Sequence, residues 1–151
     1  MNRWKIPPIE KIYEAYSAIA DNRVTMKNSN SAMVLSSNKK KEYIVTFEDK
    51  LYTSNDNASF WQGYYGYPVI AVLMIQNKLS LDIQIANKFK NLNWNALNEK
   101  YKRNYTKVVE IVLNQLKENN TDILKIQLEV KKVFGELERL ELEYKRSKKI
   151  K

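Results

Sequence analysis

The sequence contains no cysteine and no histidine among its 151 residues. Without cysteine the chain can form neither a disulfide nor a thiolate nucleophile. Without histidine it lacks the commonest protein metal ligand and the usual general base near neutral pH. Any enzyme built from this chain would have to use carboxylates, tyrosines, lysines or hydroxyls. The composition therefore favours a non-enzymatic protein, and neither a metal nor a cofactor is expected.

Long apolar runs are scarce as well. The longest, Val69–Ile75, is far shorter than the ~20 residues that a membrane-spanning helix needs. The first eight residues contain no hydrophobic signal core, so we expect a cytoplasmic protein without a membrane partner. Hydrophobic residues make up 44% and charged residues 28%, which is typical of a folded chain rather than a disordered one. We expect a single domain over residues 1–151.

Basic residues exceed acidic ones by 26 to 17, which gives a formal net charge of +9. The excess peaks at Lys39–Lys41, at Lys100–Arg103 and in the tail 145–151. A surface of this kind permits contact with the phosphates of nucleic acid, so nucleic acid is a conceivable partner. An ordinary solvated surface carries a similar charge, and that alternative is favoured.

The first half of the chain predicts an α+β domain. Helical spacing of apolar residues from Ile9 to Ala20 indicates an amphipathic helix. Three short strands follow at Ala32–Ser36, Glu42–Phe47 and Leu51–Thr53, and Arg23–Met26 could add a fourth. Because the connections are only a few residues long, the three strands should form a small antiparallel meander packed on helices.

Three helical segments are expected after this meander. The first is a short segment from Ala58 to Tyr64, with Asp56 or Asn57 as its N-cap. The second covers residues 68–76 and is apolar on all sides, so it should form the buried centre of the domain. The third runs from Leu81 to Phe89.

The rest of the chain predicts a long C-terminal antiparallel helical hairpin over residues 94–146. Its first helix spans Trp94–Lys117, and its second, capped by Thr121, keeps a heptad pattern from Ile123 to Tyr144. The expected organisation is therefore an α+β core over 1–93, the hairpin over 94–146 and a basic tail over 147–151.

The stretch 55–67 is the candidate binding site because polar groups lie beside aromatic rings there. Its candidate ligand- or partner-binding residues are Asn55, Asp56, Asn57, Trp61, Gln62, Tyr64, Tyr65 and Tyr67. Gly63 and Gly66 could let a ligand or another backbone come close. The same aromatics could instead fill the core above a short sheet, with the glycines relieving crowding before Pro68.

Two further site hypotheses come from charged residues. Acid–base chemistry could use the carboxylates of Asp56, Asp21 and Glu14, with a tyrosine near Asp56. Nothing in the sequence places two of these carboxylates together, and structural capping is the favoured role of Asp56 and Asp21. Nucleic-acid binding would use Lys100, Arg103 and Lys107, which share one side of the expected helix 94–117. The competing interpretation is again an ordinary solvated helix face.

The last helix also suggests a homodimer. Leu124, Leu128, Phe134 and Leu142 lie beside the heptad positions and widen the apolar face beyond what one partner helix can cover. We therefore expect a non-enzymatic interaction protein that self-associates through this helix and binds a partner with residues 55–67. The alternatives are a weak, sequence-independent nucleic-acid binder and an enzyme with a carboxylate–tyrosine site.

Overall fold

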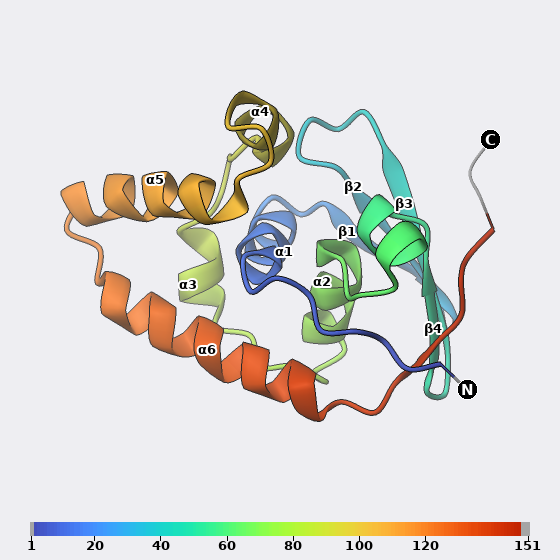
Figure 1. Cartoon of the computed structure of the whole chain (residues 1–151). Helices are drawn as coiled ribbons and strands as arrows, with labels where there is room; N and C mark the ends of the chain where they lie inside the picture. The colour runs from blue at the N-terminus through green and yellow to red at the C-terminus, as the bar shows by residue number, and fades with distance from the viewer. Residues whose placement is uncertain (1, 149–151) are drawn as a thin grey trace.

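The computed structural model describes residues 2–148 and has a mixed α+β fold. The strands are β1 (Val24–Asn28), β2 (Ser31–Leu35), β3 (Glu42–Glu48), β4 (Leu51–Ser54) and β5 (Glu143–Tyr144). The helices are α1 (Lys11–Ala20), the π-helix η1 (Ala58–Gln62), α2 (Tyr67–Ile75), α3 (Ile83–Asn87), α4 (Trp94–Lys100), α5 (Tyr105–Glu118) and α6 (Ile123–Arg139). Figure 1 shows the sheet on one side of the molecule, α1 and α3–α6 on the other, and α2 between them.

The sheet has five strands in the order β1-β2-β3-β4-β5, so the prediction of three strands was wrong. The antiparallel pairings β2–β3 and β3–β4 are confirmed, and β1 adds an antiparallel edge strand where a fourth strand had been considered. The fifth strand pairs parallel to β4 and comes from residues expected to be helical.

The expected buried centre is confirmed. Every residue of α2 from Pro68 to Met74 is buried, because the helix is covered by α1 on one side and by the sheet on the other. Burying one large aliphatic side chain of this kind contributes roughly 1.5–3 kcal/mol. A single hydrophobic core extends from Trp4 to Leu142, so segments near both ends of the chain are packed into it.

The predicted helix 94–117 is two helices, α4 and α5. Lys102 and Arg103, which lie between α4 and α5, have φ of 53° and 62°. These left-handed values interrupt the right-handed helix. The side chain of Asn104 then accepts a hydrogen bond from the Lys107 N–H and caps the new helix. Asparagine competes with the helical backbone in this way, so the apolar periodicity alone did not reveal the break.

The last helix begins and ends differently from the prediction. Asp122, not Thr121, caps α6, because its carboxylate accepts from the Lys125 N–H at 3.1 Å. The helix ends at Arg139, whereas the heptad pattern had been extended to Tyr144. Residues 143–144 instead pair with the edge of β4, and the Glu143 N–H donates to the Lys50 carbonyl at 2.8 Å.

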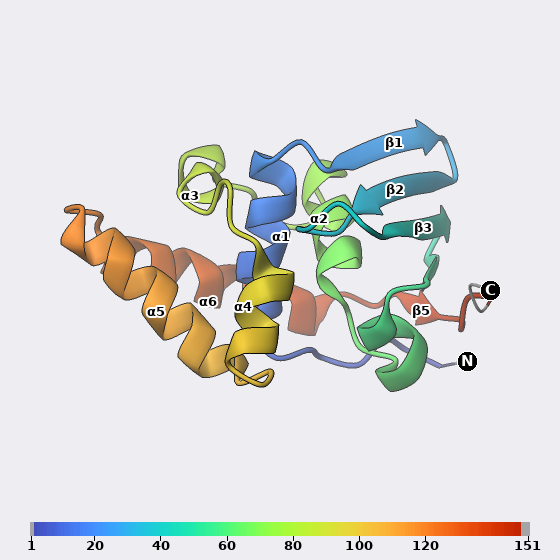
Figure 2. The same ribbon diagram turned by 90° about the horizontal axis from the view of Figure 1, so that it is seen from above.

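A closely packed helical hairpin is not confirmed. In Figure 1 and Figure 2, α5 and α6 run apart from the turn that joins them. The apolar seam of α6 is buried against α1 and the rest of the core in the same chain. The seam residues are Ile126, Val130, Val133 and Leu137.

The segment between α2 and α3 is hydrogen-bonded to α6 through Ser80. The N–H and hydroxyl of Ser80 donate to the two carboxylate oxygens of Glu136 at 2.7 and 2.6 Å. Asp82 caps α3, which is shorter than the expected helix 81–89. Of the expected basic tail 147–151, residues 149–151 lie outside the described part of the chain. Within residues 2–148 no helix combines the length and the apolar character that crossing a membrane requires.

Candidate functional site

The stretch 55–67 does not form one site, because its side chains point to different parts of the molecule. Asn55 accepts a hydrogen bond from the Ile44 N–H at 2.9 Å and so extends the contact between β3 and β4. Asn57 is exposed. The π-helix η1 follows and ends at Gly63, whose φ of 71° is readily adopted only by glycine.

Asp56 is buried and acts as a structural cap. Its carboxylate accepts from the Ser54 hydroxyl at 2.5 Å and from the Ser59 N–H at 3.1 Å. A Cβ atom placed on Gly66 would lie 2.0 Å from Asp56 Oδ2, so the glycine is needed for this close approach. The carboxylate therefore joins β4, η1 and the N-terminus of α2, where the helix dipole also favours a negative charge.

The three tyrosines of the stretch differ in burial. Tyr65 is 1% exposed and its ring stacks on Trp4 with centroids 5.0 Å apart. Tyr67 is half-buried and meets the edge of Tyr43 at 6.3 Å. Burial raises the pKa of the Tyr67 phenol and also that of the half-buried Tyr64. Tyr65 is thus a core residue, as the alternative interpretation of the stretch had it.

Trp61 and Gln62 point outward and line a groove of about 680 Å³. We call it the Trp61 groove. Its lining residues are Asn2, Arg3, Lys5, Trp61, Gln62, Gly63, Tyr144, Lys145 and Arg146. Among these described residues four are basic and none is acidic. By contrast, the grooves beside α6 are lined partly by Asp82, Asp122 and Glu110.

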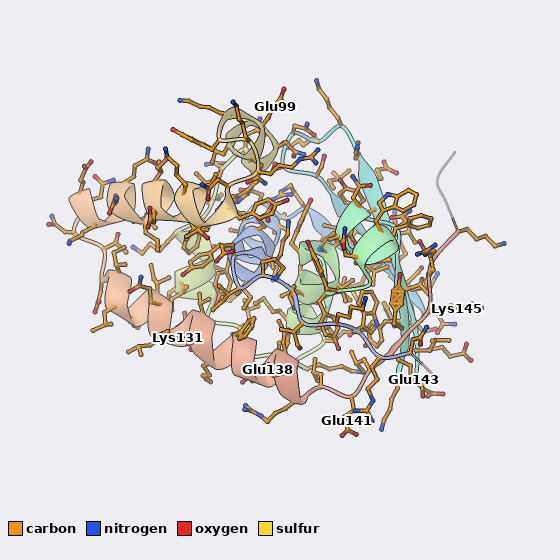
Figure 3. All side chains as sticks on the ribbon, viewed as in Figure 1. Glu99, Lys131, Glu138, Glu141, Glu143 and Lys145 are labelled. Atoms are coloured by element: carbon orange, nitrogen blue, oxygen red, sulfur yellow. The ribbon has the colours of Figure 1, made fainter. Side chains whose placement is uncertain are left out.

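Three segments far apart in the sequence build the Trp61 groove. Main-chain hydrogen bonds join Lys5 N–H to the Gly63 carbonyl at 2.9 Å and Tyr144 N–H to the Asn2 carbonyl at 2.8 Å. The Tyr144 hydroxyl donates to the Ser59 carbonyl at 2.6 Å. The labelled side chains of Glu143 and Lys145 in Figure 3 mark the C-terminal segment where it runs beside the N-terminal one.

Trp4 anchors these segments from below. It is 6% exposed, and its ring lies between Tyr65 and Tyr144, whose centroids are 5.0 and 4.8 Å away. Its indole N–H donates to the Glu143 carbonyl at 3.1 Å. Sequence reasoning missed Trp4, Arg3 and the Tyr144 segment as parts of a site. The available signal was one aromatic residue in an otherwise polar N-terminal segment.

The rim of the groove combines aromatic rings with a cation. Trp61 is 58% exposed and meets the Phe60 ring edge-on at 4.7 Å. The Arg146 guanidinium lies 5.1 Å from the Phe60 ring centroid. Arg3 comes within 4.0 Å of the Glu141 carboxylate, but both side chains are largely exposed, so this ion pair contributes little.

A second polar cluster is buried between α1, α4 and α5. Lys11 and Glu14 form an ion pair at 3.3 Å, and both are less than a tenth exposed. The Asn98 amide donates to Glu14 at 3.3 Å, and Lys11 Nζ lies 4.1 Å from the Tyr105 ring centroid. Burial raises the pKa of the Glu14 carboxyl, while Lys11 and Asn98 act in the opposite direction.

The carboxylates considered for acid–base work therefore have separate partners. Asp21 lies 3.5 Å from Arg23 and accepts from the Asn91 N–H at 2.8 Å, Glu14 pairs with Lys11, and Asp56 caps η1. Among the described residues no group of three or more acidic side chains gathers where it could hold a metal ion.

The basic residues of the α4–α5 region are not arranged on one helix face. Lys100 ends α4, Arg103 lies in the left-handed turn, and Lys107 lies in the first turn of α5. Lys100 and Lys107 nevertheless both lie over the Tyr101 ring, with Nζ 5.4 and 5.6 Å from its centroid. The break in the helix thus brings two of the three cations together on an exposed surface.

The outer face of α6 exposes two leucines near its N-terminal end. Leu124 and Leu128 are 65% and 58% exposed, and Ile83 of α3 is 52% exposed. Both leucines line a groove together with Asp82, Glu129, Lys125 and Lys132. Of the other residues expected to widen this face, Phe134 is half-buried, and Leu142 is buried beyond the end of the helix.

Residues 4–143 match a protein family described as "Uncharacterised conserved protein UCP014422". The chain belongs to this family. The match runs from Trp4, which anchors the Trp61 groove, to Glu143 in β5, so it includes parts of all three segments that build the groove. No curated protein and no solved structure matches the chain.

Proposed function

We propose that this protein is a non-enzymatic interaction protein, which self-associates through the outer face of α6 and binds a partner in the Trp61 groove. The observation that carries the first part is a pair of exposed leucines on α6 that lie outside its buried apolar seam. The seam is buried within the chain, whereas Leu124 and Leu128 are 65% and 58% exposed. An apolar patch bordered by charged residues is typical of a protein interface.

The charges around this patch favour a second copy of the same chain as the occupant. Asp82, Asp122 and Glu129 are acidic, whereas Lys125 and Lys132 are basic, and all five line the same groove. In a two-fold interface the same surface meets itself, so a patch with both signs can place acidic groups opposite basic ones. A partner of one sign would face like charges in this groove.

Sedimentation velocity at micromolar concentration tests the proposed dimer. The chain has a mass of 17.9 kDa, so the expected species has twice that mass. Leu128→Glu should yield a monomer with an unchanged circular dichroism spectrum, because it places a carboxylate in an apolar interface. The matched control is Met26→Glu, which replaces an apolar residue 40% exposed on the edge strand β1. A monomeric parent protein, or dissociation by Met26→Glu as well, would contradict the proposal.

The partner-binding part is supported by the Trp61 groove, where an exposed aromatic ring lies among basic side chains. The nucleic-acid hypothesis at Lys100 and Lys107 has weaker support, because Arg103 lies apart in the turn. A cytoplasmic location belongs to this proposal, since a chain without cysteine needs no oxidising compartment. Imaging of a fluorescent fusion would test it.

A further inference from the structure

We propose that the Trp61 groove binds single-stranded nucleic acid, with its cations on the phosphates and a base stacked on Trp61. This inference rests on the partner-binding role proposed for the groove and specifies its ligand. Proteins that bind single strands without sequence preference combine a basic groove with aromatic side chains on which bases stack. Both features meet here in a groove to which three segments of the chain contribute.

All the charged side chains among the described lining residues of the groove are basic. Arg3 and Lys5 come from the N-terminal segment, and Lys145 and Arg146 come from the segment after β5. None of the described lining residues is acidic, so the side chains that line the groove favour a polyanion. The nearest recorded acidic partner, Glu141, lies 4.0 Å from Arg3 in a pair open to water. Such a pair is weak, so Arg3 can exchange it for a phosphate.

The aromatic platform is held in place before any ligand binds. The η1 helix that carries Trp61 ends at Gly63, whose carbonyl accepts from the Lys5 N–H. A Cβ on Gly63 would lie 3.4 Å from the Tyr144 ring, so the loop is packed closely on the C-terminal segment. Because the platform is already ordered, binding loses little conformational entropy in the protein.

A single strand fits this arrangement better than a duplex or a membrane does. A duplex would offer phosphates to the cations, but its bases are stacked on one another and could not reach Trp61. A lipid surface would require apolar residues protruding around the tryptophan, whereas Asn2, Gln62 and the four cations surround it here. In a single strand the exposed bases can stack on Trp61, and the regularly spaced phosphates can pair with the basic side chains.

Fluorescence anisotropy with the full chain and a fluorescein-labelled oligothymidine of about 12 nucleotides tests this inference, because sites of this kind cover about 4–16 nucleotides. Four neutralised phosphates predict that affinity falls about 50-fold between 50 and 200 mM salt. Trp61→Ala should weaken binding between about 5-fold and about 150-fold through lost stacking, whereas Trp61→Phe should retain most of it. The double variant Arg3→Gln/Lys5→Gln should reduce the 50-fold salt effect to about 7-fold, because two phosphate contacts are lost.

Tryptophan fluorescence gives an independent readout. Trp4 and Trp94 are 6% and 3% exposed, so quenching by a stacked base reports on Trp61. The quenching should disappear in Trp61→Phe although anisotropy still shows binding. The circular dichroism spectrum of Trp61→Ala should match that of the parent, because the side chain is 58% exposed and lies outside the buried core.

Each of the following results would overturn the inference. They are no binding of oligothymidine at 50 mM salt, equal binding by Trp61→Ala, equal affinity for a duplex of the same length, and Trp61-dependent binding to phosphatidylserine vesicles but not to the oligonucleotide. Competition by inorganic phosphate at concentrations equal to those of the oligonucleotide would also overturn it, since the site would then hold a single phosphate. The dimer is measured separately by sedimentation. A dimer that fails to bind oligothymidine would contradict only the inference, and a monomer that binds it only the self-association.

Discussion

Gly66→Ala should be one of the most destabilising single changes in this protein, although the backbone at this position is unstrained. Its φ of −74° and ψ of 165° suit any residue. At such a position alanine normally stabilises a protein by about 0.4–1 kcal/mol, because it restricts the unfolded chain. Here the added Cβ would lie 2.0 Å from Oδ2 and 2.8 Å from Cγ of Asp56. The sign of the effect therefore depends on whether this buried carboxylate can move.

The hydrogen bonds of Asp56 set the expected magnitude. To escape the new Cβ, the carboxylate must leave the Ser54 hydroxyl and the Ser59 N–H, which lie 2.5 and 3.1 Å away. A hydrogen bond to a charged group contributes about 1.5–3 kcal/mol, so losing both costs about 3–6 kcal/mol. Single domains unfold at a total cost of about 5–15 kcal/mol. Gly66→Ala should therefore remove a large share of the stability.

Urea unfolding followed by circular dichroism measures this cost, and Gly135→Ala is the matched control. Gly135 lies inside α6, and a Cβ there would meet only the Arg139 guanidinium at 3.4 Å. The control should gain about 1 kcal/mol from the higher helix propensity of alanine. Two glycine-to-alanine changes in one protein thus have opposite expected signs.

A double-mutant cycle identifies the cause. In an Asp56→Ala background the carboxylate that opposes the new Cβ is gone, so Gly66→Ala should cost little beyond the first change. The reasoning is refuted if Gly66→Ala costs less than about 1 kcal/mol, because the loss of both hydrogen bonds of Asp56 should cost about 3–6 kcal/mol. It is refuted equally if the cost is the same with and without the Asp56 carboxylate.

Three further changes test other parts of the structure. Trp4→Ala should cost about 3–5 kcal/mol in urea unfolding, because the ring is buried between Tyr65 and Tyr144; a cost near that of a surface change would contradict its role as an anchor. Lys100→Gln/Lys107→Gln should leave oligonucleotide affinity and its salt dependence unchanged in anisotropy, and a flattened salt dependence would move the binding site to the α4–α5 surface. The raised pKa of Glu14 means that its contribution to stability is complete below the ordinary value of 4.5 and is lost as the pH rises through the folded-state value. The free energy of unfolding in urea should therefore rise for Glu14→Gln relative to the parent as the pH increases. A difference that does not depend on pH would exclude this linkage.

Local patterns predicted the buried core of the fold well. The residues of α2 are apolar on every side, so burial between two layers was the arrangement their sequence required. The polar turns after Leu35 and Phe47 are too short for anything but antiparallel pairing. In these elements the residues that decide the structure are close neighbours in the sequence.

The end of α6 shows where such patterns fail. Leu140 and Tyr144 continue the heptad spacing, but the backbone at Leu140 is extended, with φ −68° and ψ 137°. The competing structure depends on β4, which is far away in the sequence. The carbonyl of Lys50, the residue before this strand, accepts a hydrogen bond from the Glu143 N–H. Helical periodicity shows only which side chains are apolar. The extended segment that leads into β5 also buries an apolar side chain, Leu142, so the apolar pattern does not distinguish it from a helix.

The stretch 55–67 illustrates why a site is harder to predict than a core. Core and binding site were posed as alternatives for the stretch as a whole, yet its residues divide between them. Tyr65 is buried on Trp4, while Trp61 is exposed only four residues earlier, because the η1 helix and the left-handed Gly63 reverse the direction of the chain between them. The buried residue also supports the exposed one, since the Trp4 ring holds Tyr65 and the Tyr144 segment together beneath the groove. Composition could identify the stretch, but the basic side chains that complete the groove come from segments near both ends of the chain, and only tertiary packing brings them together.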